Sequence, residues 1–199
     1  MKLKLYRVVQ EDNQDEEIGA YGKGIYLLWN KSDALMMASR EGKWCVQTCH
    51  IKLDDLNGVN LMEPGAWLSY ARCYLEQERV KMSALEQRVL QAKKYDWCIG
   101  PVIDDNLRPV IDAYNEGNLS VDEFKEMYLS FSLGFNVVLM SEAAKQRYKP
   151  GRRVRLSKRR KRTWSSMRQT VQELAVQKLN ELLNERSVKL CQMEIGYHV

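Results

Sequence analysis

The segment Tyr21-Gly22-Lys23-Gly24-Ile25-Tyr26 combines residue types that suit the binding of a small ligand. Its two glycines permit a tight turn and a close approach of the backbone to a ligand. The apolar residues at its end predict a strand, on which Tyr26 is the aromatic side chain. A hairpin turn before a strand explains the same glycines equally well, and Tyr26 is equally compatible with a place in the core.

Two other segments carry side chains that could complete a site with Tyr26. Arg7 lies in an otherwise apolar stretch, residues 3–9, which predicts the first strand. Its planar guanidinium suits bidentate contacts to phosphate, although on a solvent-facing strand position it would only be a surface charge. Far downstream, Gly100-Pro101 and the pair Asp104-Asp105 follow a short apolar stretch. A strand-ending turn and a helix N-cap at Asp104 are the ordinary explanation of that segment.

The basic residues are concentrated in one part of the chain. Of the 31 Lys and Arg residues, eleven lie between Lys145 and Arg162, where there is no acidic residue. The rest of the chain therefore has 20 basic against 26 acidic side chains, a net charge of −6, although the whole chain has a formal charge of +5. A dense run of cations favours a polyanionic partner, since Lys and Arg can neutralise several phosphates at once.

Composition indicates a globular protein of the cytoplasm. The 199 residues suit one domain with an appendage, and no apolar run approaches the roughly 20 residues that a membrane span needs. The first residues lack a secretory signal, and five scattered cysteines are typical of reduced thiols. Cys45, Cys49 and His50 could suggest a metal site, but no second ligand pair has zinc spacing. We expect buried thiols on a strand there, and no metal.

Periodicity predicts an α+β protein. Strands are expected at residues 3–10, 21–29, 44–53, 95–99 and 135–140, and helices at 34–42, 64–75, 83–94, 109–117 and 120–134. Ser83, Ser120 and Ser141 are expected to cap helices. Pro150-Gly151 predicts a boundary between a domain at 1–149 and an extension at 150–199. The extension would contain the basic run, a long amphipathic helix and a final strand near 188–195.

These motifs resemble those of a bacterial ADP-ribosyltransferase-like toxin family that is often encoded beside a small antitoxin. The resemblance rests on Gly22-Lys23-Gly24-Ile25-Tyr26, on the Gly100-Pro101 element with Asp104-Asp105, and on Ser141-Glu142 after a late strand. It covers roughly residues 3 to 149, and the Gly-Pro-x-x-Asp-Asp element is its most specific part. It implies a split β-sandwich with flanking helices and NAD as the substrate bound in a cleft.

The resemblance also implies roles for individual residues. Arg7 and Gly24 would contact NAD, Tyr26 would stack on nicotinamide, and cleavage of the nicotinamide–ribose bond would pass through an oxocarbenium-like state, as in glycoside cleavage. Asn136 stands where such enzymes usually carry Glu or Gln, and its oxygen can accept a hydrogen bond from the ribose without supplying a negative charge. Glu142 is the alternative at this position. Asp104 and Asp105 would line the cleft or touch the acceptor.

We therefore expect a toxin of a toxin–antitoxin or phage-defence system that transfers ADP-ribose to nucleic acid, with RNA favoured over DNA. ADP-ribosylation of a protein is one alternative, and a non-enzymatic nucleic-acid-binding module on a degenerate transferase fold is another. Expected partners are a cognate antitoxin and nucleic acid, without a membrane. The predicted nucleic-acid-binding residues are Arg152, Arg153, Arg155, Lys158, Arg159, Arg160, Lys161 and Arg162.

Overall fold

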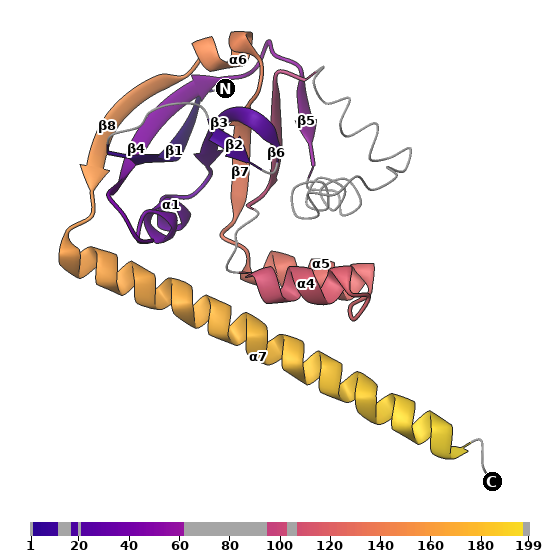
Figure 1. Ribbon diagram of the computed structural model, residues 1–199. Helices are drawn as coiled ribbons and strands as arrows, with labels where there is room; N and C mark the ends of the chain where they lie inside the picture. The colour runs from indigo at the N-terminus through magenta and orange to yellow at the C-terminus, as the bar shows by residue number, and fades with distance from the viewer. Residues whose placement is uncertain (1, 12–16, 20, 62–94, 103–106, 197–199) are drawn as a thin grey trace. The chain divides into compact units, whose positions relative to one another are not determined.

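The structure, a computed structural model, describes residues 2–11, 17–19, 21–61, 95–102 and 107–196 (Figure 1). Its contacts divide the chain into two compact units. The first comprises Met1–Ile103 and Leu133–Ser166, and the second comprises Asp104–Ser132 and Met167–Val199. The predicted helices at 64–75 and 83–94, with Ser83, lie outside the described residues, as do Asp104 and Asp105.

The first unit is built on a mixed sheet. Seven strands lie in the order β5-β6-β7-β3-β1-β4-β8, and β2 pairs with β3 beside this path. β5 and β6 are parallel, and the other described pairs are antiparallel. The strands are β1 (Lys2–Gln10), β2 (Glu17–Gly19), β3 (Gly22–Leu28), β4 (Trp44–Lys52), β5 (Gly58–Asn60), β6 (Trp97–Pro101), β7 (Phe135–Leu139) and β8 (Lys149–Arg155).

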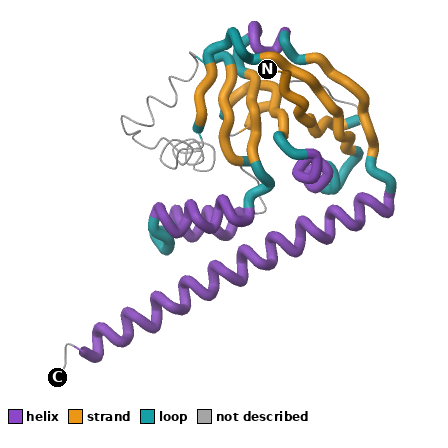
Figure 2. The backbone as a smooth tube through the Cα atoms, turned by 180° about the vertical axis from the view of Figure 1, so that it is seen from behind, coloured by secondary structure: helices purple, strands orange, loops and turns teal. Residues whose placement is uncertain are grey.

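Each face of this sheet carries apolar side chains and is packed against a short helix. Because successive residues of a strand point to opposite faces, Leu5 and Val8 of β1 belong to different clusters. The Leu5 cluster includes Ala144 of α6 (Glu142–Gln146). The Val8 cluster includes Ala34 of α1 (Lys31–Met37), around which the strands curve (Figure 2). The sheet is therefore the centre of the first unit's core.

The second unit consists of α4 (Arg108–Asn115), α5 (Val121–Phe131) and most of α7 (Lys158–Gly196). The rings of Tyr114 and Phe124 stack with centroids 4.4 Å apart. Arg186 of α7 donates a hydrogen bond to the Asn118 carbonyl oxygen at 2.7 Å and forms an ion pair with Glu123. None of the described helices is long and apolar enough to cross a membrane.

The helix caps and the buried thiols predicted from the local sequence are confirmed. Ser120 and Glu123 form the predicted capping box at the start of α5, and the Ser141 hydroxyl accepts a hydrogen bond from the Ala144 N–H. Cys45 and Cys49 are buried in β4 as free thiols. Within the described residues no group of His, Cys, Asp or Glu is arranged to hold a metal ion.

Two expectations for the end of the chain need correction. Residues 188–195 are helical, because α7 continues without a break to Gly196, and no final strand forms there. The boundary predicted between 149 and 150 falls inside β8, which pairs with β4. Residues 149–155 therefore belong to the sheet, and the basic run is shared between a strand and a helix. The described chain is mixed α+β, while the split β-sandwich stays a prediction.

Candidate functional site

The glycine motif at residues 21–26 and the Gly100-Pro101 element meet in the structure through Tyr21. Its side chain is buried, and its hydroxyl donates a hydrogen bond of 2.6 Å to the carbonyl oxygen of Pro101, 80 residues away. The same hydroxyl lies 2.4 Å from the position that a Cβ on Gly100 would occupy. Gly100 is thus required by the packing of Tyr21. Sequence reasoning did not single out Tyr21, although it opens the glycine motif.

Gly24 and Tyr26 also have packing roles. A Cβ on Gly24 would lie 2.7 Å from the carbonyl oxygen of Leu139, so this glycine allows β3 to approach β7 closely. The Tyr26 hydroxyl accepts a hydrogen bond of 2.9 Å from the Tyr21 N–H, and the two rings have centroids 6.5 Å apart. The glycine–tyrosine segment consequently forms an ordered contact between β3, β6 and β7.

Strand register places the predicted catalytic residues on two different faces. Leu28 is paired with Tyr6 of β1 and with Asn136 of β7, so these three side chains share a face. Tyr26, two residues before Leu28, lies on that same face. Arg7 follows Tyr6 and points to the opposite face. The structure brings Tyr26 and Asn136 together, and it does not bring Arg7 to them.

Arg7 belongs instead to a polar cluster near β8. It is 4% exposed, and it is paired across the sheet with Gln47, which is paired in turn with Arg153. Its guanidinium carbon lies 5.7 Å from the ring centroid of Tyr148. The Tyr148 hydroxyl donates a hydrogen bond of 2.7 Å to the Gln47 side-chain oxygen. Burial raises the pKa of Tyr148, and a hydrogen bond with Arg7 and its positive charge act in the opposite direction.

Of the other predicted cleft residues, Asn136 lies on the face of Tyr26, and Glu142 lies in α6. Asn136 is buried, at 8% exposed, and it is paired with Gly100 of β6 and with Leu28 of β3. It therefore lies on the face that carries Tyr26. Glu142 is an exposed residue in the first turn of α6 and forms an ion pair of 2.9 Å with Lys145. An acidic side chain in that position stabilises the helix N-terminus, which is a sufficient reason for its presence.

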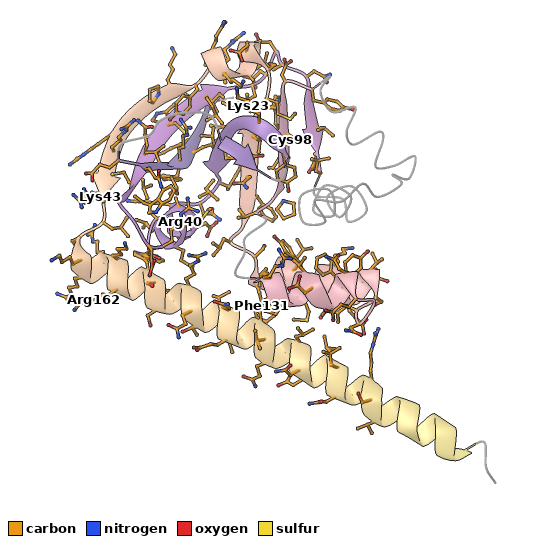
Figure 3. The ribbon with its side chains drawn as sticks, in the orientation of Figure 1. Lys23, Arg40, Lys43, Cys98, Phe131 and Arg162 are labelled. Carbon is orange, nitrogen blue, oxygen red and sulfur yellow. The ribbon has the colours of Figure 1, made fainter. Side chains whose placement is uncertain are left out.

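The predicted nucleic-acid-binding residues come from two consecutive elements, and we call this group the β8–α7 surface. It is not one flat face, because Arg153 shares the sheet face of Gln47 and Arg7, whereas the start of α7 packs on the opposite face, with the Val8 cluster. Arg152, Arg153 and Arg155 come from β8, and the other five come from the first turns of α7. Six of the eight side chains are exposed, and Arg153 and Lys161 are half-buried. Figure 3 shows Arg162 at the start of α7, and both Arg162 and Lys43 lie toward the left of the view.

The start of α7 is held against the sheet by two buried or half-buried side chains. Leu156 and Trp164 pack into the cluster of apolar residues around Val8. The Ser157 hydroxyl accepts a hydrogen bond of 3.4 Å from the Arg160 N–H, and Lys161 donates one of 3.0 Å to the Gly42 carbonyl oxygen. The cations of β8 and of the first turns of α7 therefore belong to one packed part of the first unit.

The chain matches no family model, no curated protein and no solved structure. Its function must therefore be argued from the arrangement of its own residues. The residues of the β8–α7 surface come from two consecutive elements, whereas the predicted NAD-binding residues lie on separate strands and are divided between two faces of the sheet.

Proposed function

We propose that this protein binds nucleic acid, in particular single-stranded RNA, through the β8–α7 surface. The observation that carries the proposal is that eight Lys and Arg residues come from two consecutive elements of the first unit, with six of them exposed. Arginine is the principal cation of the surface, and its planar group contacts phosphate oxygens in a bidentate manner. Contacts to the phosphates of a strand would supply most of the binding free energy.

A flexible single strand suits this surface better than a rigid duplex does. The cations are distributed over the end of a strand and the first turns of a helix, so a ligand must bend to reach all of them. Side chains four residues apart, such as Lys158 and Arg162, lie on one side of α7, while Arg160 projects from another. Single-stranded nucleic acid can follow such a path, because its backbone is not fixed in a helix.

The salt dependence of RNA affinity tests this proposal. We expect the dissociation constant of a short fluorescent RNA strand, measured by polarisation, to rise steeply with salt. With about five phosphate contacts, the logarithm of the association constant should fall with the logarithm of the salt concentration with a slope of about −3.5. Each contact to a single strand contributes about −0.7 to this slope. Single-stranded and duplex DNA serve as comparison ligands. An affinity that stays constant from low to moderate salt would contradict the proposal.

NAD-dependent ADP-ribosyl transfer is a second candidate, and one observation favours it. Tyr26 and Asn136 share a face beside the contact between Tyr21 and Gly100-Pro101. An aromatic ring and an amide oxygen there could orient nicotinamide and the adjoining ribose. This is the chemistry that the family resemblance implies, in a toxin that a cognate antitoxin would hold inactive. The β8–α7 surface would hold the acceptor nucleic acid.

Incubation with NAD labelled in its adenylate phosphate tests the second candidate. We expect label to appear in RNA, and we expect Asn136→Ala to lower the rate by about 100-fold, because one oriented polar group is typically worth that much in a transition state. Arg7→Met should retain the rate per folded molecule, since Arg7 points to the opposite face. Transfer to protein alone would favour the alternative acceptor. Absence of label from RNA, DNA and protein would remove this candidate without affecting the binding proposal.

A further inference from the structure

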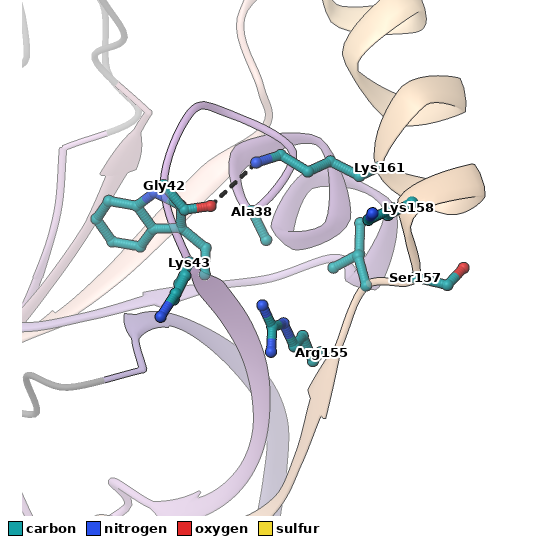
Figure 4. A pocket seen from close by; sticks show the side chains of 9 residues that line it. Ala38, Gly42, Lys43, Arg155, Ser157, Lys158 and Lys161 are labelled. Carbon is teal, nitrogen blue, oxygen red and sulfur yellow. Dashed lines mark hydrogen bonds between the residues drawn. The ribbon is translucent and has the colours of Figure 1, made fainter.

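A cavity of about 600 Å³ lies within the β8–α7 surface, which supplies three of the cations that line it. Four cationic residues line it, and they come from three separate segments of the first unit: Lys43 precedes β4, Arg155 ends β8, and Lys158 and Lys161 lie in the first turns of α7. Figure 4 shows Arg155 directed into the space between Lys43 and the start of α7. The cavity has the size of a site for a small ligand.

The charges around this cavity favour an anion. Bringing four cations to one cavity is unfavourable unless a negative group compensates them, and the start of α7 adds the positive end of a helix dipole. The carboxylate of Glu11 already approaches Arg155, with 3.4 Å between Oε1 and Nη1. This contact shows that Arg155 donates to an anionic oxygen at the edge of the cavity. It is exposed and long, so a more highly charged group can replace it.

The remaining wall of the cavity is apolar and aromatic. Ala38, Trp44 and Leu156 form it. The indole of Trp44 is held in place, because its Nε1 donates a hydrogen bond of 2.6 Å to the Glu41 carbonyl oxygen. The guanidinium of Arg40 lies 3.6 Å above the ring. A fixed aromatic wall beside four cations suits a ligand that carries both a phosphate and a flat ring.

We propose that this cavity binds a nucleoside phosphate. The phosphate contacts Lys43, Arg155 and Lys158, and the nucleoside lies against Trp44 and Leu156. A free nucleotide and the 5′-phosphate end of a nucleic-acid strand share this chemistry. The strand end rests on the proposed function, since the rest of the strand would follow the β8–α7 surface, whereas binding of a free nucleotide does not depend on it.

Titration of the full chain with adenosine 5′-monophosphate, adenosine and inorganic phosphate, followed by calorimetry, tests the cavity. We expect the monophosphate to bind at least about tenfold more tightly than adenosine, since the charged contacts dominate. The double variant K43Q/R155Q should lose about tenfold or more of this affinity. The matched variant R152Q/R159Q removes the same charge from residues that do not line the cavity, and it should change the affinity less than about threefold. Glu11→Gln should tighten binding, because it removes a competing carboxylate.

A short RNA with and without a 5′-phosphate distinguishes the two sources of ligand. A gain in affinity from the 5′-phosphate that disappears in K43Q/R155Q identifies the strand end, and tight binding of the monophosphate alone identifies a free nucleotide. Equal binding of adenosine and its monophosphate, together with no gain from the 5′-phosphate, overturns the proposal. Failure of the proposed function would look different, because RNA would then bind neither in a salt-dependent manner nor through Arg152 and Arg159.

Discussion

Replacing Arg152, Arg159, Arg160 and Arg162 by glutamine is expected to lower the affinity for single-stranded RNA by about 100-fold at 0.1 M salt. These four side chains are exposed and do not line the cavity near Trp44. A slope of about −0.7 per contact corresponds to a factor of about 5 per phosphate between 1 M and 0.1 M salt. With three of the four arginines in contact with a phosphate at one time, their loss gives roughly 100-fold. The salt slope should decrease in parallel, which polarisation measurements at several salt concentrations would show.

A matched variant separates a local loss of contacts from a general loss of charge. Lys2, Lys4, Lys31 and Lys52 are also exposed and lie outside the basic run. Replacing these four by glutamine removes the same net charge, and we expect a change in affinity below about threefold because screening weakens distant charges. Similar losses in both variants would show that RNA is attracted by the net charge alone, and would contradict a defined β8–α7 surface.

Gly100→Ala is expected to destabilise the first unit by about 3 kcal/mol. The new Cβ would lie 2.4 Å from the hydroxyl oxygen and 2.7 Å from the Cζ atom of Tyr21, so the buried ring must move. Overpacking of this kind costs about 1–3 kcal/mol, and the hydrogen bond from Tyr21 to the Pro101 carbonyl would be lost as well. Urea denaturation followed by circular dichroism measures the change in the free energy of unfolding.

A double-mutant cycle shows whether the collision with Tyr21 is the cause. Tyr21→Leu removes the hydroxyl and the end of the ring. In that background Gly100→Ala should lower the free energy of unfolding by at least about 1 kcal/mol less than it does in the natural chain. Gly117→Ala provides a comparison, because no atom lies within 4 Å of its Cβ position and its cost comes from the positive φ of 78°. Strictly additive effects at Gly100 and Tyr21 would contradict the contact that joins the two sequence motifs.

The features that the sequence predicted correctly are those with local causes. The Ser120–Glu123 capping box needs only four consecutive residues, and the first strand, predicted at 3–10 and found at Lys2–Gln10, needs only a short apolar stretch. β8 was missed because its sequence, Lys149 to Arg155, is basic, contains Pro150 and Gly151, and has an exposed edge position. Such residues are typical of a loop, and the pairing with β4 that makes them a strand is not visible in the local sequence.

The arrangement of the candidate site depends on strand register and on pairing between distant segments, which local sequence patterns do not reveal. Whether Arg7 and Tyr26 share a face is decided by the register between β1 and β3, and a shift of one residue would reverse the answer. The cavity beside Trp44 combines Lys43 with Arg155 and Lys158, which follow it by more than one hundred residues. They meet only because β8 returns to the sheet next to β4. The basic run was visible in the sequence, but the third segment that completes this cavity was not.

The position of β8 has a consequence for the behaviour of the protein at high concentration. Among the described strands β8 forms one edge of the sheet, where unpaired backbone groups could recruit a strand of another molecule. A second β8 that paired in parallel and in register would set Arg152, Arg153 and Arg155 against the same arginines of its neighbour, and this repulsion opposes fibre growth. Loss of these charges is therefore expected to promote self-association as well as to weaken nucleic-acid binding. The repulsion between the arginines opposes self-association whether or not a nucleic acid is present.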